Sequence, residues 1–201
     1  RWDEDDTVVA IYYDTNEKPC GYMVYLIKND VVHIKEMIYL TREAQNGLWE
    51  FIRAHDSMID EVRGSSYTGE PIAFELEDGD IRETIRPYIM GRIVDAEQFF
   101  QKYHCDAAAD NAMITFEMED SFLAWNNRAI TVCFNKGECS VSEAHTHSRV
   151  KLSIATLTTL LLGYKTAARL YQMGRIEGDR ETINRLDDCI LHEMPYISDY
   201  I

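Results

Sequence analysis

The sequence lacks the features of a secreted or a membrane-spanning protein. It contains no signal-peptide pattern and no apolar run long enough to cross a bilayer. No two cysteines have the Cys-x-x-Cys spacing, and an odd number of cysteines cannot all pair within one chain. The five cysteines are Cys20, Cys105, Cys133, Cys139 and Cys189. We therefore expect reduced thiols, a cytoplasmic protein and no membrane partner.

Basic residues are also scarce. Lysine and arginine number 20 against 35 aspartates and glutamates, which gives a net charge of −15. Such a balance argues against nucleic acid as a partner, because the phosphate backbone repels an acidic protein. It is compatible with cationic small molecules and equally with ordinary solubility. The apolar fraction of 46% is large enough to bury a core, and the length allows one large domain or two small ones.

Internal repeats and low-complexity tracts are absent as well, and only one residue group suggests a metal. Glu143, His145 and His147 alternate, so a strand would place all three side chains on one face. The serines and threonines around them favour a loop or a solvated strand end instead. We adopt the second interpretation and predict no metal site.

The first part of the chain has the pattern of a β-meander followed by a helix. Apolar strands between residues 7 and 40 are separated by turns, one of them Asn29-Asp30. Residues 22–27 are apolar on both faces, which predicts a central strand. A helix over about 42–58 follows, and its apolar stripe includes His55, which we interpret as a core or rim histidine.

The start of that helix is a candidate phosphate-binding junction. A strand that enters a helix through glycines offers free backbone amides to a pyrophosphate, and GNAT acetyltransferases have Arg/Gln-x-x-Gly-x-Gly/Ala there. In this sequence Arg42 and Gly47 fit, but Gln45 replaces a glycine and Glu43 adds a negative charge. We interpret the junction as a plain helix N-terminus that does not bind coenzyme A.

Residues 63–86 mix turn residues with a short apolar patch and are interpreted as a junction between domains. The pattern then resumes with a predicted strand over 88–94 and a helix over 95–103. Asp95 precedes that helix and Gln98 lies three residues further on, which is a capping-box spacing.

A mostly antiparallel sheet and three short helices complete the prediction. The sheet comprises a strand over 112–119 and a hairpin over 129–142 around Asn135-Lys136-Gly137. The helices lie between 156 and 191; Gly163 and Gly174 end the first two, and Asp179 caps the third.

Three stretches resemble one enzyme family. They are "RPYIMGRIVDAEQFF" from Arg86, "LTTLLLGYKTAARLYQMGRIEGD" from Leu157, and the ending "PYISDYI". They are similar to the C-terminal part of the Eis (enhanced intracellular survival) N-acetyltransferases. The resemblance implies an α+β chain with two domains. A partial, degenerate second GNAT-like domain, a meander plus helix, would span 1–82, and a sterol-carrier-protein-like domain would span 83–201.

The resemblance also implies an activity for a longer protein. Such enzymes transfer acetyl from acetyl-CoA to primary amines of aminoglycoside or lysine type. The acetyl-CoA-binding GNAT domain precedes the part that this chain resembles, so the chain alone should not catalyse. The expected partners are the amine acceptor, that N-terminal GNAT domain and further copies of the chain, since the family suggests a hexamer.

Three residues acquire roles through the resemblance. The terminal carboxylate of Ile201 corresponds to the general base, Tyr200 to a residue that lines the acceptor pocket, and Asp95 to an aspartate that faces the acceptor amine. The family favours an aromatic last residue and often has an acidic penultimate one, so this chain departs from it at both positions. Two alternatives remain: a lipid-carrier module and a domain that only builds an oligomer.

Overall fold

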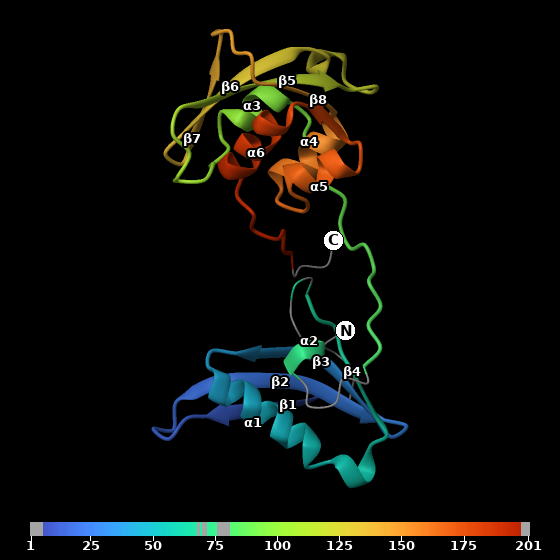
Figure 1. Ribbon diagram of the computed structural model, residues 1–201. Helices are drawn as coiled ribbons and strands as arrows, with labels where there is room; N and C mark the ends of the chain where they lie inside the picture. Colours follow the sequence, from blue (N-terminus) through green and yellow to red (C-terminus); the bar gives the residue numbers. More distant parts are fainter. Residues whose placement is uncertain (1–5, 68, 70–71, 76–80, 198–201) are drawn as a thin grey trace. The chain divides into compact units, whose positions relative to one another are not determined.

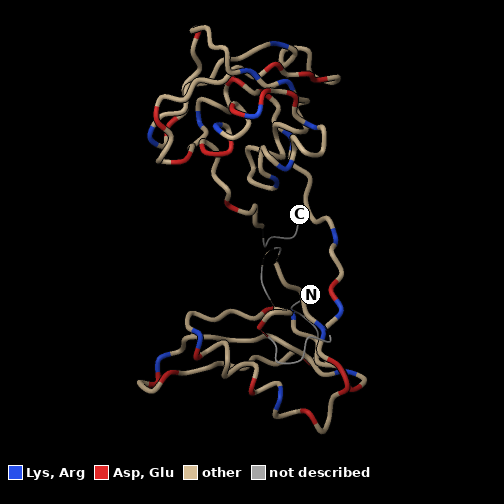
Figure 2. Tube along the Cα trace, viewed as in Figure 1, with Lys and Arg blue, Asp and Glu red and all other residues tan. Residues whose placement is uncertain are grey.

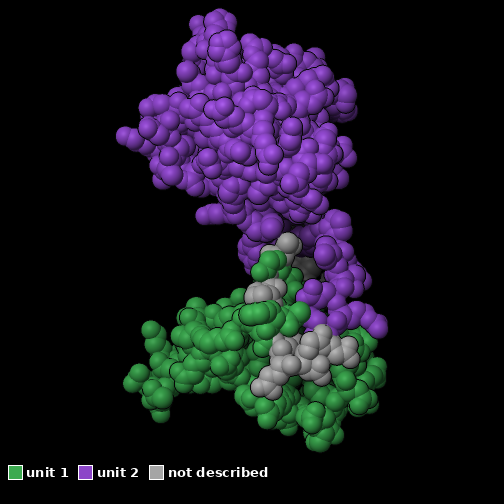
Figure 3. All heavy atoms as spheres, in the orientation of Figure 1, with its two compact units in different colours: residues 1–79 green, residues 80–201 purple. Residues whose placement is uncertain are grey.

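A computed structural model describes residues 6–67, 69, 72–75 and 81–197 (Figure 1). The chain divides into two compact units, residues 1–79 and residues 80–201 (Figure 3). Each unit combines one sheet with helices, so the predicted α+β class is confirmed. None of the described helices is long and apolar enough to cross a membrane.

The first unit is built on a four-stranded sheet in the order β1-β2-β3-β4. The strands are β1 (Val8–Tyr13), β2 (Pro19–Lys28), β3 (Val31–Tyr39) and β4 (Glu61–Arg63). The first three form the predicted antiparallel meander, and β2 is central, with Met23 to Leu26 buried. Asn29 and Asp30 both have positive φ, as a two-residue hairpin turn requires. The parallel pairing of β4 with β3 was not predicted.

One helix, α1 (Arg42–Arg53), covers one face of this sheet (Figure 1). Leu48 and Ile52 pack against Met23 and Tyr25. The helix is shorter than the predicted 42–58, because the His55 backbone N–H bonds to the Ile52 carbonyl three residues back. That tighter spacing leads into a 3-10 turn, η1 (Asp56–Met58).

The second unit contains a five-stranded sheet in the order β7-β6-β5-β8-β9. Its strands are β5 (Ala112–Glu119), β6 (Ala129–Asn135), β7 (Glu138–Ser142), β8 (Arg149–Ser153) and β9 (Ile176–Gly178). The predicted hairpin joins β6 to β7 through Lys136 and Gly137, both with positive φ. Every pair is antiparallel except β5 with β8, and neither β8 nor β9 was predicted.

Helices cover one face of this second sheet (Figure 1). They are α3 (Ala96–Phe100), α4 (Ile154–Leu161), α5 (Ala167–Gln172) and α6 (Arg180–Cys189). Between the two layers lie the rings of Phe100, Phe116 and Phe134, none of them exposed. The Phe100 and Phe116 centroids are 5.0 Å apart and those of Phe116 and Phe134 are 6.2 Å apart, so aromatic contacts organise the centre of the core.

The segment between the units differs from its prediction. The strand predicted over 88–94 is wrong, because residues 88–94 pair with no strand among the described residues. Instead, the Ile93 backbone N–H donates to the Thr158 hydroxyl at 3.1 Å, so a side chain of α4 replaces a ladder partner. The predicted junction over 63–86 contains the short helix α2 (Ile72–Glu75).

Candidate functional site

Asp95 lies at the start of α3, where the chain enters the core of the second unit. The Gln98 backbone N–H donates to one carboxylate oxygen at 3.0 Å, and the Gln98 side-chain amide donates to the other at 2.8 Å. The predicted cap is therefore confirmed. The backbone bond has the larger effect, and together the two bonds hold the pKa of the Asp95 carboxyl below its usual range. A half-exposed carboxylate that is ionised at neutral pH can also attract a cation.

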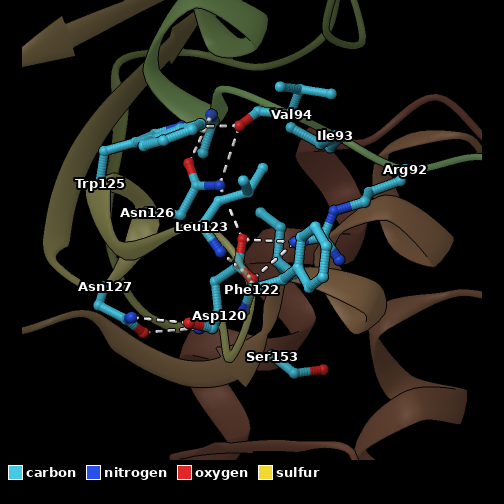
Figure 4. Close-up of polar contacts among 12 residues, drawn as sticks. Arg92, Ile93, Val94, Asp120, Phe122, Leu123, Trp125, Asn126, Asn127 and Ser153 are labelled. Atoms are coloured by element: carbon cyan, nitrogen blue, oxygen red, sulfur yellow. Dashed lines mark hydrogen bonds and ion pairs between the residues drawn. The ribbon is translucent and has the colours of Figure 1, made fainter.

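A polar cluster around Asp120 joins the segment that carries Asp95 to the connection between β5 and β6 (Figure 4). The Asp120 side chain is 1% exposed. One Arg92 nitrogen donates to its two oxygens at 2.6 and 2.8 Å, and Asn126 donates at 2.9 Å. The backbone N–H groups of Phe122 and Leu123 donate at 2.9 and 3.1 Å. Five donated bonds thus satisfy one buried carboxylate.

These bonds fix the charge of the cluster. Burial alone would raise the pKa of the Asp120 carboxyl, because a low dielectric disfavours the charged form. The hydrogen bonds from Asn126, from the two backbone N–H groups and from Arg92 outweigh burial, and the pKa lies well below its usual range. Asp120 is therefore an anion near neutral pH, and it anchors Arg92 across 28 residues of sequence.

Asn126 connects this anchor to the helix that Asp95 caps. Its amide donates to Asp120 and to the Val94 carbonyl, and its oxygen accepts from the Ala96 backbone N–H at 3.1 Å. Val94 and Ala96 are the two neighbours of Asp95 in the chain. Asn126, 2% exposed, therefore holds the backbone on both sides of Asp95.

Exposed aromatic rings accompany the cluster. The Trp125 indole donates to the Val94 carbonyl at 2.9 Å, and 55% of the residue is exposed (Figure 4). Phe122 is 82% exposed, and the Arg92 guanidinium lies 5.6 Å from its ring centroid. The Trp125 indole thus bonds to the residue that precedes Asp95, and an aromatic face together with an anionic carboxylate can hold an organic cation.

The sequence did not reveal this cluster. A local signal was present, because Asp120 directly follows an apolar strand and Asn126-Asn127 come shortly after it, a pattern typical of side-chain-stabilised turns. The partner Arg92 lies on a distant segment, so only the folded structure identifies it.

Ile201 and Tyr200 lie outside the described residues, and their predicted roles remain predictions. The tail is described as far as Ile197. It leaves α6 through the buried Ile190, and the Leu191 backbone N–H donates to the Tyr103 hydroxyl at 3.4 Å. Burial raises the pKa of Tyr103 to about 12, so this hydroxyl is neutral near pH 7.

The start of α1 does not fit a pyrophosphate. Gln45 is 6% exposed, and its amide donates to Glu75 at 2.6 Å and to the Tyr39 hydroxyl at 3.1 Å. Glu43 and Glu75 both carry negative charge at this end of the helix, and that charge would repel the oxygens of a phosphate group. Gly47 serves packing, since a Cβ there would lie closer than 3.0 Å to the Tyr12 ring.

The third candidate group lies in a loop. Glu143, His145 and His147 are exposed residues between β7 and β8, so the alternation of a strand does not apply to them. Within the described residues no histidine, cysteine, aspartate or glutamate side chains form a group of three that could hold a metal ion.

Two family models match the chain, one after the other. The acetyltransferase (GNAT) domain matches residues 1–93, and the sterol carrier protein domain matches residues 96–198. No curated protein matches the sequence.

Solved structures match both units together. A protein from Enterococcus faecalis V583, described as a probable N-acyltransferase, is 30% identical with a TM-score of 0.85, and the match covers 96% of this chain and 49% of that one. A GCN5-related N-acetyltransferase from Anabaena variabilis is 21% identical, with a TM-score of 0.73 and coverage of 96% and 50%.

Eis1 from Mycobacterium abscessus is 17% identical, with a TM-score of 0.67 and coverage of 88% and 47%. At such identity the second and third structures show a shared fold alone, and the chain spans about half the length of the structures it matches. Because one family model covers slightly more than half of the residues, the chain belongs to the sterol carrier protein domain family, and it carries that domain after an acetyltransferase (GNAT) domain.

Proposed function

We propose that this chain is the C-terminal half of an Eis-type N-acetyltransferase that transfers acetyl from acetyl-CoA to primary amines of aminoglycoside or lysine type. One observation carries the proposal. The probable N-acyltransferase of Enterococcus faecalis is 30% identical over 96% of this chain, so the likeness runs through both units in one order. A lipid carrier would need only the second unit.

Acetyl-CoA is assigned to a preceding GNAT domain. The strand-to-helix junction at Arg42 to Gly47 is occupied by the side chains of Gln45 and Glu75, and the carboxylates of Glu43 and Glu75 lie beside it. The chain would therefore contribute the acceptor side of the reaction, within a cytoplasmic homo-oligomer.

Asp95 would bind the ammonium form of the acceptor. Its carboxylate is ionised and half-exposed, and the Asp120 cluster fixes the backbone on both sides of it. Trp125, bonded to the neighbouring Val94, would add an aromatic face for the same cation. Tyr200 would line the acceptor pocket.

The carboxylate of Ile201 would act as general base. An α-carboxyl group has a pKa of about 3.5 in water, where it is a weak base. Partial removal from water raises the pKa and brings it closer to that of a useful base. The carboxylate would take one proton from the bound ammonium group, which frees the nitrogen lone pair to attack the acetyl carbonyl carbon. The C–S bond of acetyl-CoA then breaks, and the second proton that the nitrogen loses ends on the departing sulfur, so coenzyme A leaves as the free thiol.

The lipid-carrier alternative has less support in the second unit. A carrier needs an apolar space between the sheet and its helices, and the fully buried rings of Phe100, Phe116 and Phe134 contact one another there. Titration of the chain with a fluorescent fatty acid tests the alternative, and saturable binding would favour it.

The proposed function is tested by two measurements on matched proteins. The longer protein that includes the preceding domain should acetylate a primary amine, with free thiol released from acetyl-CoA at the same rate. Calorimetric titration of the 201-residue chain alone should show no heat of acetyl-CoA binding. Micromolar affinity for the isolated chain, or a longer protein that transfers no acetyl to any amine tried, would contradict the proposal.

A further inference from the structure

Two helices of the second unit end in the same motif. After α4, the Gly163 N–H bonds to the Leu160 carbonyl at 2.9 Å and the Tyr164 N–H to the Thr159 carbonyl at 3.1 Å. After α5, the corresponding bonds of Gly174 and Arg175 measure 2.9 and 2.8 Å. The φ angles of the two glycines are 72° and 65°, so both helices end in a left-handed glycine of the Schellman type.

The two glycines differ in what lies over them. A Cβ on Gly163 would lie closer than 3.0 Å to the Glu193 carbonyl oxygen and 3.3 Å from the Leu191 carbonyl oxygen. A Cβ on Gly174 would meet nothing within 4 Å among the described residues. Left-handed geometry explains both glycines, but only Gly163 also makes room for another segment of the chain.

That segment is the beginning of the C-terminal tail. Besides its approach to Gly163, it is held by the His192 ring, whose Nε2 lies 3.0 Å from the Asp187 carbonyl oxygen. The Leu191 N–H contacts the Tyr103 hydroxyl. Residues 190–193 thus follow a defined path from α6 across the end of α4.

The segment that enters the unit meets the same helix end. A Cβ on Gly91 would lie 3.0 Å from the Leu162 side chain and 3.8 Å from that of Thr158. In Figure 1 the segment that enters the second unit and the tail that follows α6 both lie on the side of the sheet that the helices cover. The last turn of α4 therefore lies between the segment that carries Asp95 and the segment that leads to Ile201.

From this geometry we infer that Gly163 is a positioning residue for the C-terminal tail. The absence of a side chain at Gly163 lets the backbone of residues 191–193 lie directly on the end of α4, and this contact sets the direction in which the last residues leave. Its effect on catalysis rests on the proposed function, since only a catalytic tail needs a fixed direction. The contact itself does not depend on that function.

A matched pair of substitutions separates tail positioning from helix ending. Gly163→Ala and Gly174→Ala impose the same left-handed strain, so both should lower the melting temperature of the 201-residue chain, and Gly163→Ala should lower it further because it also loses the contact with the tail. Only Gly163→Ala should displace the tail. Hydrogen exchange of the Leu191 amide should then become roughly tenfold faster than in the Gly174→Ala variant. Equal exchange in the two variants would overturn the inference.

A second pair covers the case in which an alanine variant fails to fold. Asparagine adopts left-handed φ more readily than alanine but still carries a Cβ. Gly163→Asn should therefore retain more of the fold and still expose the Leu191 amide, whereas Gly174→Asn should leave it protected. Protection in both asparagine variants would again overturn the inference.

The longer protein then tests the link to catalysis. Gly163→Asn should lower kcat and leave the KM for acetyl-CoA unchanged, and Gly174→Asn should alter neither. If Gly163→Asn released the tail and kcat stayed unchanged, Gly163 would still position the tail, but the terminal carboxylate would not be the base. If the tail stayed in place in Gly163→Asn, the positioning role of Gly163 would be refuted, whatever the value of kcat.

Discussion

Asp95 combines two roles that different substitutions separate. As a cap it accepts two bonds from Gln98, and as an anion it would attract the acceptor amine. Asparagine caps a helix about as well as aspartate but carries no charge. Asp95→Asn thus removes the charge alone, and Asp95→Ala removes both.

We expect Asp95→Asn to raise the KM for the amine in the longer protein with little change in melting. Asp95→Ala should raise KM similarly and also lower the free energy of unfolding by about 1 kcal/mol. Steady-state kinetics and urea denaturation measure the two effects. An unchanged KM in both variants would leave Asp95 with the cap alone.

At the scale of elements, the Asp120 cluster explains how an irregular segment is held without a strand. Residues 88–94 pair with no strand of the described part of the chain. Instead, the Arg92 side chain donates to Asp120, the Ile93 N–H donates to Thr158, and the Val94 carbonyl accepts from Asn126. The bond between Arg92 and Asp120 is the charged one of this set, and its acidic member is buried.

Asp120→Asn should therefore destabilise the chain by about 3 kcal/mol, since removing the charge of a buried carboxylate that accepts several hydrogen bonds costs far more than losing a solvated ion pair. Glu97→Gln is the control, because both members of its pair with Arg128 are partly exposed and the pair should contribute less than about 1 kcal/mol. Urea denaturation at pH 7 compares the two. Losses of equal size would refute the anchoring role of Asp120.

The pH dependence of stability gives a second check on Asp120. Its pKa is lower in the folded than in the unfolded chain, so its stabilisation is fully present above the ordinary carboxyl pKa of about 4 and is lost as the pH falls toward the lower native pKa. The Asp120→Asn variant should show a shallower loss of stability below pH 4 than the unsubstituted chain.

The sequence predicts the elements that depend on neighbouring residues and misses those that depend on distant partners. The caps at Asp95 and Asp179, the turn at Asn29-Asp30 and the glycine helix ends involve residues at most a few positions apart, and all were predicted. The strands that were missed depend on distant partners. β8 pairs with β5 across more than thirty residues, and β4 and β9 are only three residues long, so neither gives a periodic pattern.

The apolar segment 88–94 was misread for the complementary reason. Its composition is that of a strand, but Tyr88, Ile89 and Met90 are exposed and no strand lies beside them among the described residues. Apolar and β-branched composition indicates that a segment can form a strand, but a strand forms only where the fold places a second strand beside it. Asp95 as a site candidate came from the family resemblance and the Asp120 cluster from the structure, because neither a role in binding nor a distant ion pair leaves a local pattern.

At the scale of the whole molecule, acidic and basic residues both occur along the described parts of the two units (Figure 2), and acidic residues outnumber basic ones to give a net charge of −15. Such a net charge attracts a cationic acceptor but does not select the place where it binds. Binding of the amine must then depend on groups in contact with it, and the terminal carboxylate is the group that the proposed function makes indispensable.

Extension of the chain beyond Ile201 tests that requirement in the longer protein. A few added residues replace the carboxylate by a neutral peptide bond and carry the new carboxylate away from its position. Loss of a general base typically lowers the rate by about 10²- to 10⁴-fold. Ile201→Val is the control, since it alters the side chain, retains the carboxylate and should keep most of the rate. Melting curves should be the same for both, because the change lies at the chain end. If the extended protein retained its rate within a few-fold, the tail would only dock on the second unit, and the base would have to be another group.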